Sequence, residues 1–234
     1  MQLSFITPRQ RNFKFPLAGE RGNALILILV AVGLFAALSY AVMKDSKGGL
    51  SQSALTTDQA RLIASALIQY GDSLRPIVDK MLLMNGVLDT DSPVGSGILF
   101  DPPGSGTAPL TRELFEATGG NAPYITPPAT ACNSTCSYVF SGQYTLTGVG
   151  TGTNPDLSML LVNVPQSVCQ MINYLMGLGT TIPTGTALTT VTPFNGTNYG
   201  AATAVTLTTS SHAICYQESS GAQRYIYVNV IRAR

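Results

Sequence analysis

Charged side chains are scarce in this 234-residue sequence. Lys, Arg, Asp and Glu together make up 11% of it, against about 25% in ordinary soluble domains. The net charge is +1, so the chain has no overall field that attracts polyanions, and a strongly basic nucleic-acid-binding protein is excluded. Hydrophobic residues make up 45%. That fraction supplies a buried core and excludes a highly charged disordered chain.

Residues for catalysis are also scarce, because the sequence has one histidine and no tryptophan. His212 could act as a base only with partners that the sequence does not reveal, and a polar residue entering a strand is the simpler interpretation. We find no GxSxG elbow, P-loop or dinucleotide-binding fingerprint. The sequence therefore predicts no catalytic residue, no cofactor and no enzyme activity, with an anchored envelope hydrolase as an alternative.

The middle of the chain is almost free of charge. Between Ala117 and Gln217 the only charged residue is Asp156. Thr, Gly, Ser, Asn, Pro and aliphatic residues dominate this stretch, and they favour strands separated by turns. A surface whose polar groups are hydroxyls and amides, with almost no charged groups, indicates an exported, β-rich domain.

One long apolar run lies near the N-terminus. Residues 24–43 contain no charge, and a helix of this length spans a hydrocarbon core about 30 Å thick. The residues before the run are mainly basic, with only Glu20 opposing them: Arg9, Arg11, Lys14 and Arg21. This charge is expected to stay in the cytoplasm and to send everything after Met43 across the membrane.

Three interpretations of this segment compete. A secretory signal peptide would be cut after the small residues that end at Ala41, but its apolar region usually has only about 7–15 residues. An uncleaved anchor would keep the whole N-terminus. A leader cut on the cytoplasmic side would release the basic residues and keep the apolar helix.

The third interpretation depends on the junction Glu20-Arg21-Gly22-Asn23-Ala24. It resembles the processing signal of type IV pilins and of the pseudopilins of type II secretion, whose peptidase cuts after such a glycine. The resemblance covers residues 19–43 and implies that Gly22 ends the leader and that Asn23 becomes the new N-terminus. Gly19 is the poorer candidate, because Glu20 and Arg21 would then begin the membrane helix.

The resemblance also implies a minor rather than a major subunit. Major pilins carry a glutamate at the fifth mature position, where this sequence has Leu27. An unpaired glutamate in lipid is costly, so its absence suits a subunit at a filament tip. Small residues that favour close helix packing accompany Leu27 in the run: Ala31, Gly33, Ala36 and Ala37.

The pattern divides the chain into four parts: a basic cytoplasmic leader at 1–22, a transmembrane helix at 23–43, a juxtamembrane helical region at 44–88 and a β-rich exported head at 89–234. Apolar periodicity predicts a helix over 50–70 that Gly71 stops. A second helix is then capped by Asp72 or Ser73, carries Pro76 in its first turn and ends at 85–86.

The head is predicted to be mainly strands. Alternation and β-branched content place them at 137–140, 144–149, 158–164, 204–208, 214–217 and 225–231. A short helix is expected over 165–176, one helical turn over 111–116, a turn-rich loop at 89–110 and an exposed loop at 178–202. The fold class is therefore α+β, with an N-terminal transmembrane helix before a β-rich head.

All four cysteines lie after the apolar run, which points to disulfides in an oxidising compartment. Four cysteines allow three pairings. We favour Cys132 with Cys136 and Cys169 with Cys215. Zinc held by these thiols and His212 is the alternative, although the spacing lacks a CxxC pair.

Aspartates in the first loop of the head suggest a possible calcium site, which some tip pseudopilins have. Asp89, Asp91 and Asp101 are the candidates. The segment departs from the EF-hand pattern, because it contains a proline and lacks the closing glutamate. A solvated loop is therefore the simpler interpretation, and no metal is expected.

Together these observations predict a minor pilin-like or pseudopilin-like subunit. Its expected location is the inner membrane of a bacterium, crossed once, with the head periplasmic or extracellular. The expected partners are other pilin or pseudopilin subunits, the prepilin peptidase and the lipid bilayer, and no nucleic acid. The alternative is an anchored, adhesin-like binding module with no role in a filament.

Overall fold

The computed structural model describes residues 28–35, 37, 55–89, 96–106, 109–150, 155–187, 191–195, 205–208 and 211–234. The chain divides into two compact units, residues 1–53 and residues 54–234. In the first unit the described residues are helical and exposed. The second unit contains both the long helix α2 and the sheet, whereas the sequence analysis separated 44–88 from 89–234.

The predicted membrane segment lies largely outside the described residues. Of 23–43, only 28–35 and 37 are described, and the leader 1–22 is outside as well. Among the helices that can be described, none combines the length and the apolar character that a membrane crossing requires.

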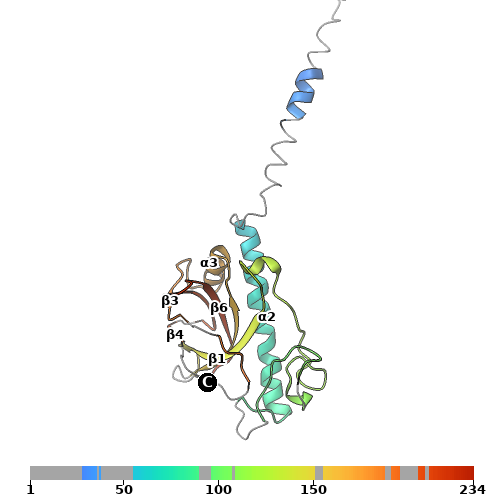
Figure 1. The fold of residues 1–234 in the computed structure, drawn as a ribbon, viewed down its shortest axis with the longest axis vertical. Helices are drawn as coiled ribbons and strands as arrows, with labels where there is room; N and C mark the ends of the chain where they lie inside the picture. Colours follow the sequence, from blue (N-terminus) through green and yellow to red (C-terminus); the bar gives the residue numbers. More distant parts are fainter. Residues whose placement is uncertain are drawn as a thin grey trace, which may run out of the picture. The chain divides into compact units, whose positions relative to one another are not determined.

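Helix α2, Thr57–Met84, is the longest element of the second unit (Figure 1). Its first turn has a capping box: the Thr56 hydroxyl accepts from the Gln59 amide, and the Gln59 side chain accepts from the Thr56 amide. Its C-cap is Asn85. Between these ends the buried face is apolar and includes Ala60, Ile63, Leu67, Leu74, Val78 and Met81.

The prediction of two helices separated at Gly71 was wrong, because α2 continues through both Gly71 and Pro76. Gly71 is buried, and a Cβ there would lie 2.4 Å from the Asn229 side-chain nitrogen. The glycine is therefore required for close packing and does not stop the helix. Pro76 is exposed, so the helical carbonyl that loses its N–H partner can be hydrated.

The sheet has six strands in the order β3-β5-β6-β2-β1-β4. Their bounds are β1 Tyr138–Thr147, β2 Asp156–Val162, β3 Thr184–Gly185, β4 Val205–Thr208, β5 Ala213–Glu218 and β6 Tyr225–Arg232. The four central strands β5, β6, β2 and β1 pair antiparallel, and the short edge strands β3 and β4 pair parallel to their neighbours. The α+β class is confirmed.

Most predicted elements of the head have counterparts in the structure. The two segments predicted at 137–140 and 144–149 form one strand, β1, with a register shift between Ser141 and Tyr144. A bulge of this kind accommodates extra residues without ending the strand. The expected helix is α3, Gln166–Leu175. Of the helical turn expected at 111–116, only 111–112 are helical, within the 3-10 helix Leu110–Arg112. A second 3-10 turn, Ala129–Ala131, and strand β3 were not predicted.

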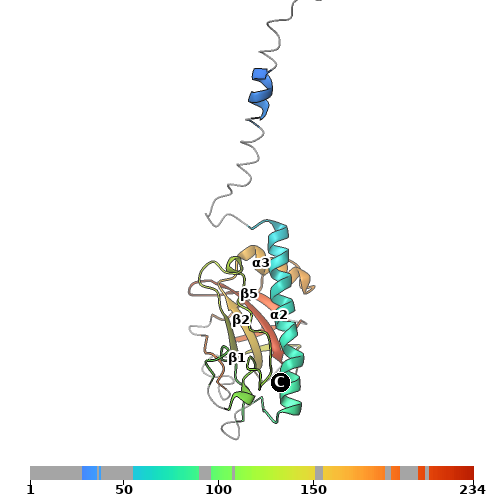
Figure 2. The same cartoon turned by 90° about the vertical axis from the view of Figure 1, so that its right-hand side faces the viewer.

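The sheet is covered on one face by α2, with α3 beside the first turns of α2 (Figure 2). A second cluster of buried residues lies on the other face and includes Tyr144, Tyr216, Leu160 and Leu207. Tyr144 and Tyr216 are on strands that are not neighbours, yet their hydroxyls are 3.1 Å apart. The sheet therefore curls around this second cluster.

Asp156, the charged residue within the neutral stretch, is buried where β2 begins. Its two carboxylate oxygens accept hydrogen bonds from the backbone amides of Leu146, at 3.1 Å, and Arg234, at 3.0 Å. Burial raises the pKa of this carboxyl, and the two amides oppose that shift. The charge therefore holds the C-terminus against β1.

Both favoured disulfides are confirmed. Cys132 and Cys136 close a short loop, and their Cα atoms are 5.6 Å apart. Cys169 on α3 is joined to Cys215 on β5, with Cα atoms 5.2 Å apart. With all four thiols oxidised, the zinc alternative lacks its thiolate ligands.

The contact at Gly71 generates a stability prediction. Gly71→Ala should lower the free energy of unfolding by about 2 kcal/mol, because overpacking at Asn229 outweighs the better helix propensity of alanine. Urea unfolding of the two proteins measures this difference. In an Asn229→Ser background the loss should be smaller, since the clashing amide is gone. An equal loss in both backgrounds would rule out this contact as the cause.

The two disulfides should contribute unequally to the free energy of unfolding. Replacing Cys169 and Cys215 by serine removes a crosslink over a sequence separation of 46 and should cost about 4 kcal/mol by loop entropy. The matched change at Cys132 and Cys136, with a separation of 4, should cost about 2 kcal/mol. Chemical unfolding of each double variant compares them, and equal losses would contradict the loop-entropy argument.

Candidate functional site

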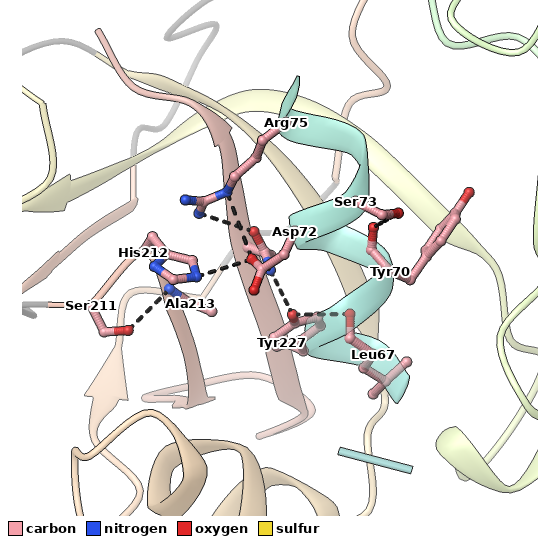
Figure 3. A network of polar contacts seen from close by, with 10 residues as sticks. Leu67, Tyr70, Asp72, Ser73, Arg75, Ser211, His212, Ala213 and Tyr227 are labelled. Carbon is pink, nitrogen blue, oxygen red and sulfur yellow. Dashed lines mark hydrogen bonds and ion pairs between the residues drawn. The ribbon is translucent and has the colours of Figure 1, made fainter. Parts of the chain in front are cut away.

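The single histidine lies in a polar network between α2 and the sheet (Figure 3). His212 Nε2 is 3.0 Å from Asp72 Oδ1. The same carboxylate oxygen lies 3.4 Å from the Asn229 side-chain nitrogen and 3.8 Å from Arg75 Nε. Asp72 and Arg75 are on successive turns of α2, whereas His212 precedes β5 and Asn229 is on β6.

The network continues inward to the helix backbone. Arg75 donates to Asn229 Oδ1 at 3.3 Å, and the Asn229 nitrogen donates to the Tyr227 hydroxyl at 2.9 Å. The Tyr227 hydroxyl in turn donates to the carbonyl of Leu67 at 3.3 Å. Tyr227 and Asn229 are fully buried. These bonds compensate the desolvation of polar groups where α2 meets the sheet.

The protonation of His212 follows from its surroundings. Burial and the nearby Arg75 guanidinium lower the pKa of the imidazole, and the Asp72 carboxylate opposes them only in part. The neutral ring then donates its Nε2 hydrogen to Asp72. Ser211 Oγ accepts from the Ala213 amide at 3.4 Å. The geometry is that of a brace between helix and sheet.

A groove in the second unit is the more accessible candidate site. It has a volume of about 240 Å³, and four segments line it: 100–102, 124–127, 136–140 and 193–194, together with Tyr70 of α2. A neighbouring hollow of about 340 Å³ shares Tyr70, Ile125, Thr126 and Tyr138 with it and extends along α2. The two hollows adjoin through these shared residues, and Cys136 of the Cys132–Cys136 loop lines the first; we call the pair the aromatic groove.

Aromatic rings that contact one another line the aromatic groove. The ring centroids of Phe100 and Phe140 are 4.4 Å apart, and those of Tyr70 and Tyr138 are 4.9 Å apart. Phe194 meets Phe100 edge to face at 6.0 Å. These contacts hold the walls in place before any partner binds.

The wall formed by 123–127 is anchored to α2 by one side chain. The Tyr70 hydroxyl donates to the carbonyl of Pro123 at 3.2 Å and accepts from the amide of Ile125 at 3.4 Å. Burial raises the pKa of Tyr70, so the hydroxyl keeps its proton. Tyr124 and Ile125 remain 46% and 50% exposed and leave an apolar rim along the groove.

Asp101, one of the three calcium candidates, lies beside a buried acid. Glu113 accepts from the Asp101 amide at 3.2 Å, and burial raises the pKa of its carboxyl. Asp89 pairs with Arg234 at 3.5 Å, and Asp91 lies outside the described residues. Within the part of the chain that the structure describes, no group of three His, Cys, Asp or Glu residues could hold a metal ion.

The predicted processing residues Gly22 and Asn23 lie outside the described residues, as do Leu27 and Ala36. Ala31, Gly33 and Ala37 are described, helical and exposed. A Cβ added at Gly33 would meet nothing within 4 Å, so the described contacts do not explain the glycine. These positions therefore have surface available for packing.

Sequence reasoning did not find the aromatic groove. Its lining comes from segments up to 124 residues apart, Tyr70 and Phe194. The one local signal is the run Pro123-Tyr124-Ile125-Thr126-Pro127-Pro128, whose prolines and exposed apolar residues favour an extended surface segment.

Comparison with protein-family models, with curated proteins and with solved structures finds no match to this chain.

The His212 brace generates a pH prediction. The folded-state pKa lies below the unfolded value of 6.5, so the unfolded chain binds the proton more readily and the brace loses stability as the pH falls below 6.5. His212→Gln should therefore reduce the decline of the unfolding free energy between about pH 7 and pH 5. Urea unfolding at each pH measures it.

Asp72→Asn provides the complementary variant. Without the carboxylate that opposes the shift, the His212 pKa should fall further, and the loss of stability should extend to lower pH. An unchanged pH dependence in both variants would show that His212 does not titrate with folding.

Proposed function

We propose that this chain is a minor pilin-like or pseudopilin-like subunit, held in the inner membrane of a bacterium by residues 24–43. The observation that carries the proposal is the basic leader, the Arg21-Gly22 junction and the uncharged twenty-residue run that follows. Cleavage after Gly22 would remove the leader and keep the apolar helix.

The architecture of residues 54–234 supports this proposal. A helix packed against a small sheet is what the resemblance implies, and α2 lies on one face of the curled sheet. Both disulfides suit an oxidising compartment beyond the inner membrane. The head that this membrane helix would carry is therefore suited to the periplasm or the cell exterior.

The mechanism we propose is assembly. The apolar helix stays in the bilayer until the helices of neighbouring subunits pack against it, and small residues such as Ala31 and Gly33 allow their close approach. With Leu27 in place of an acid, this subunit needs no neighbour above it to neutralise a charge. That property suits a minor subunit at the tip of a filament.

The role we propose for the described chemistry is structural. His212 and Asp72 brace α2 against the sheet, and Asp156 holds the C-terminus. We therefore propose no enzyme activity and no cofactor.

An anchored envelope-binding module with no role in a filament is the second candidate, and the aromatic groove favours it. The groove presents an apolar rim at Tyr124 and Ile125, as a recognition surface would. In this case the N-terminus would stay uncut and the protein would remain a monomer.

The mature N-terminus distinguishes the two candidates. Full-length protein is produced with and without a prepilin peptidase, extracted from membranes and examined by intact-mass spectrometry. We expect a chain that starts at Asn23 only when the peptidase is present. Gly22→Val should abolish this product, because the side chain obstructs the processing site. The matched change Gly19→Val should leave it unaltered.

Two results would contradict the filament proposal. An intact Met1 in the presence of the peptidase would leave the anchored binding module. Cleavage after Ala41 would mean that the head is released as a soluble domain.

A further inference from the structure

The first half of β1 has an open outer side. β1 spans Tyr138–Thr147, and its inner side pairs with β2. On the outer side, β4 pairs only with residues 144–147. The segment 136–140 therefore has no strand beside it among the described residues, and this is the segment that lines the aromatic groove.

Strand alternation shows which backbone groups face the groove. The Phe140 carbonyl accepts from the Phe194 amide at 2.7 Å, so Phe140 directs its backbone groups outward. Tyr138, two residues earlier, shares that direction, whereas Val139 directs its groups toward Leu160 of β2. Among the described residues, the Tyr138 amide and carbonyl make no backbone hydrogen bond outside the strand pairs, and the alternation directs them away from β2.

The groove supplies side-chain surface on both sides of this open edge. Apolar and aromatic residues dominate its lining, and Tyr124 and Ile125 face it from the opposite wall. Asp101 is the only charged residue among those that line it. The site thus offers an unpaired backbone edge, apolar walls and one negative charge.

We infer that the aromatic groove binds an extended peptide segment of a partner protein, which adds as a strand beside Tyr138. The peptide backbone exchanges hydrogen bonds with the Tyr138 amide and carbonyl, as in other cases of strand addition. Alternate apolar side chains of the peptide contact the exposed residues Tyr124 and Ile125, and a Lys or Arg side chain of the peptide lies near Asp101. The strand residues 138–140 provide an edge about 10 Å long.

A peptide fits this site better than the other ligand that an aromatic lining suggests, a glycan. Glycans stack on exposed ring faces, whereas Phe100, Phe140, Phe194 and Tyr70 are all less than 10% exposed. The outward-facing amide and carbonyl of Tyr138 can exchange hydrogen bonds with the backbone of an extended peptide, which a glycan lacks. The inference concerns residues 54–234 and does not depend on processing at Gly22.

The test uses the full chain in detergent micelles and a fluorescently labelled heptapeptide of alternating threonine and valine with a central arginine. Two further peptides carry N-methyl groups on alternate amides, one on the odd set and one on the even set. Strand addition uses only one set, so one methylated peptide should bind at least about fivefold more weakly while the other binds as the parent does. Fluorescence anisotropy measures all three affinities.

Asp101→Asn tests the charge. The variant should bind the arginine peptide about fivefold more weakly, and a peptide with glutamine in place of arginine equally well. Asp58→Asn, a change in the exposed first turn of α2, is the matched control and should alter neither affinity. Hydrogen–deuterium exchange of the full chain should show slower exchange over 136–140 when the parent peptide is bound.

Several results would overturn the inference. Equal binding of both methylated peptides would exclude strand addition, and so would no binding of the parent peptide at millimolar concentration. Binding of N-acetylglucosamine oligomers with no binding of the peptide would assign the groove to glycans. Self-association of the chain that the peptide cannot displace, with 136–140 protected, would assign the groove to a second copy.

Discussion

The close contact between Gly71 of α2 and Asn229 of β6 is the constraint on which the second unit depends. With no side chain at Gly71, Asn229 can reach the helix, donate to Tyr227 and lie beside Asp72. Tyr227 is then bonded to the carbonyl of Leu67. This contact determines how near α2 lies to the sheet, and the apolar face of α2 completes the core there. Tyr70 directly precedes Gly71 on α2. The same placement of the helix therefore also positions the wall of the aromatic groove that Tyr70 holds through Pro123 and Ile125.

The second face of the sheet is organised differently. Curling of the sheet brings Tyr144 and Tyr216 together, and burial raises the pKa of Tyr216 to about 12. Glu218 is buried nearby and pairs with Arg224 at 2.8 Å. Asp156 receives two backbone amides. These charged side chains are thus paired or hydrogen-bonded inside the fold.

The two proposals rest on different parts of the chain. The filament role rests on the N-terminal sequence, with the helix-on-sheet architecture as support. The inferred peptide site rests on the edge of β1 and on the rings that line it. The ring stacking of Phe100 and Phe140 and the Cys132–Cys136 loop hold the groove in shape, which suits the inferred peptide site. A partner then pays little of the entropy of ordering this surface.

Local patterns in the sequence were enough to predict most elements of the head and the favoured cysteine pairs. The alternation at 225–231 predicted β6, the apolar periodicity of 165–176 predicted α3, and the favoured pairs are the disulfides of the structure. Tertiary structure decided the rest. Whether Gly71 ends a helix or packs against one depends on Asn229, far along the chain, so local propensity gave the wrong answer. The aromatic groove likewise unites Tyr70, Tyr138 and Phe194 only after the sheet forms, because sequence periodicity reports which face of an element is buried and not which elements meet.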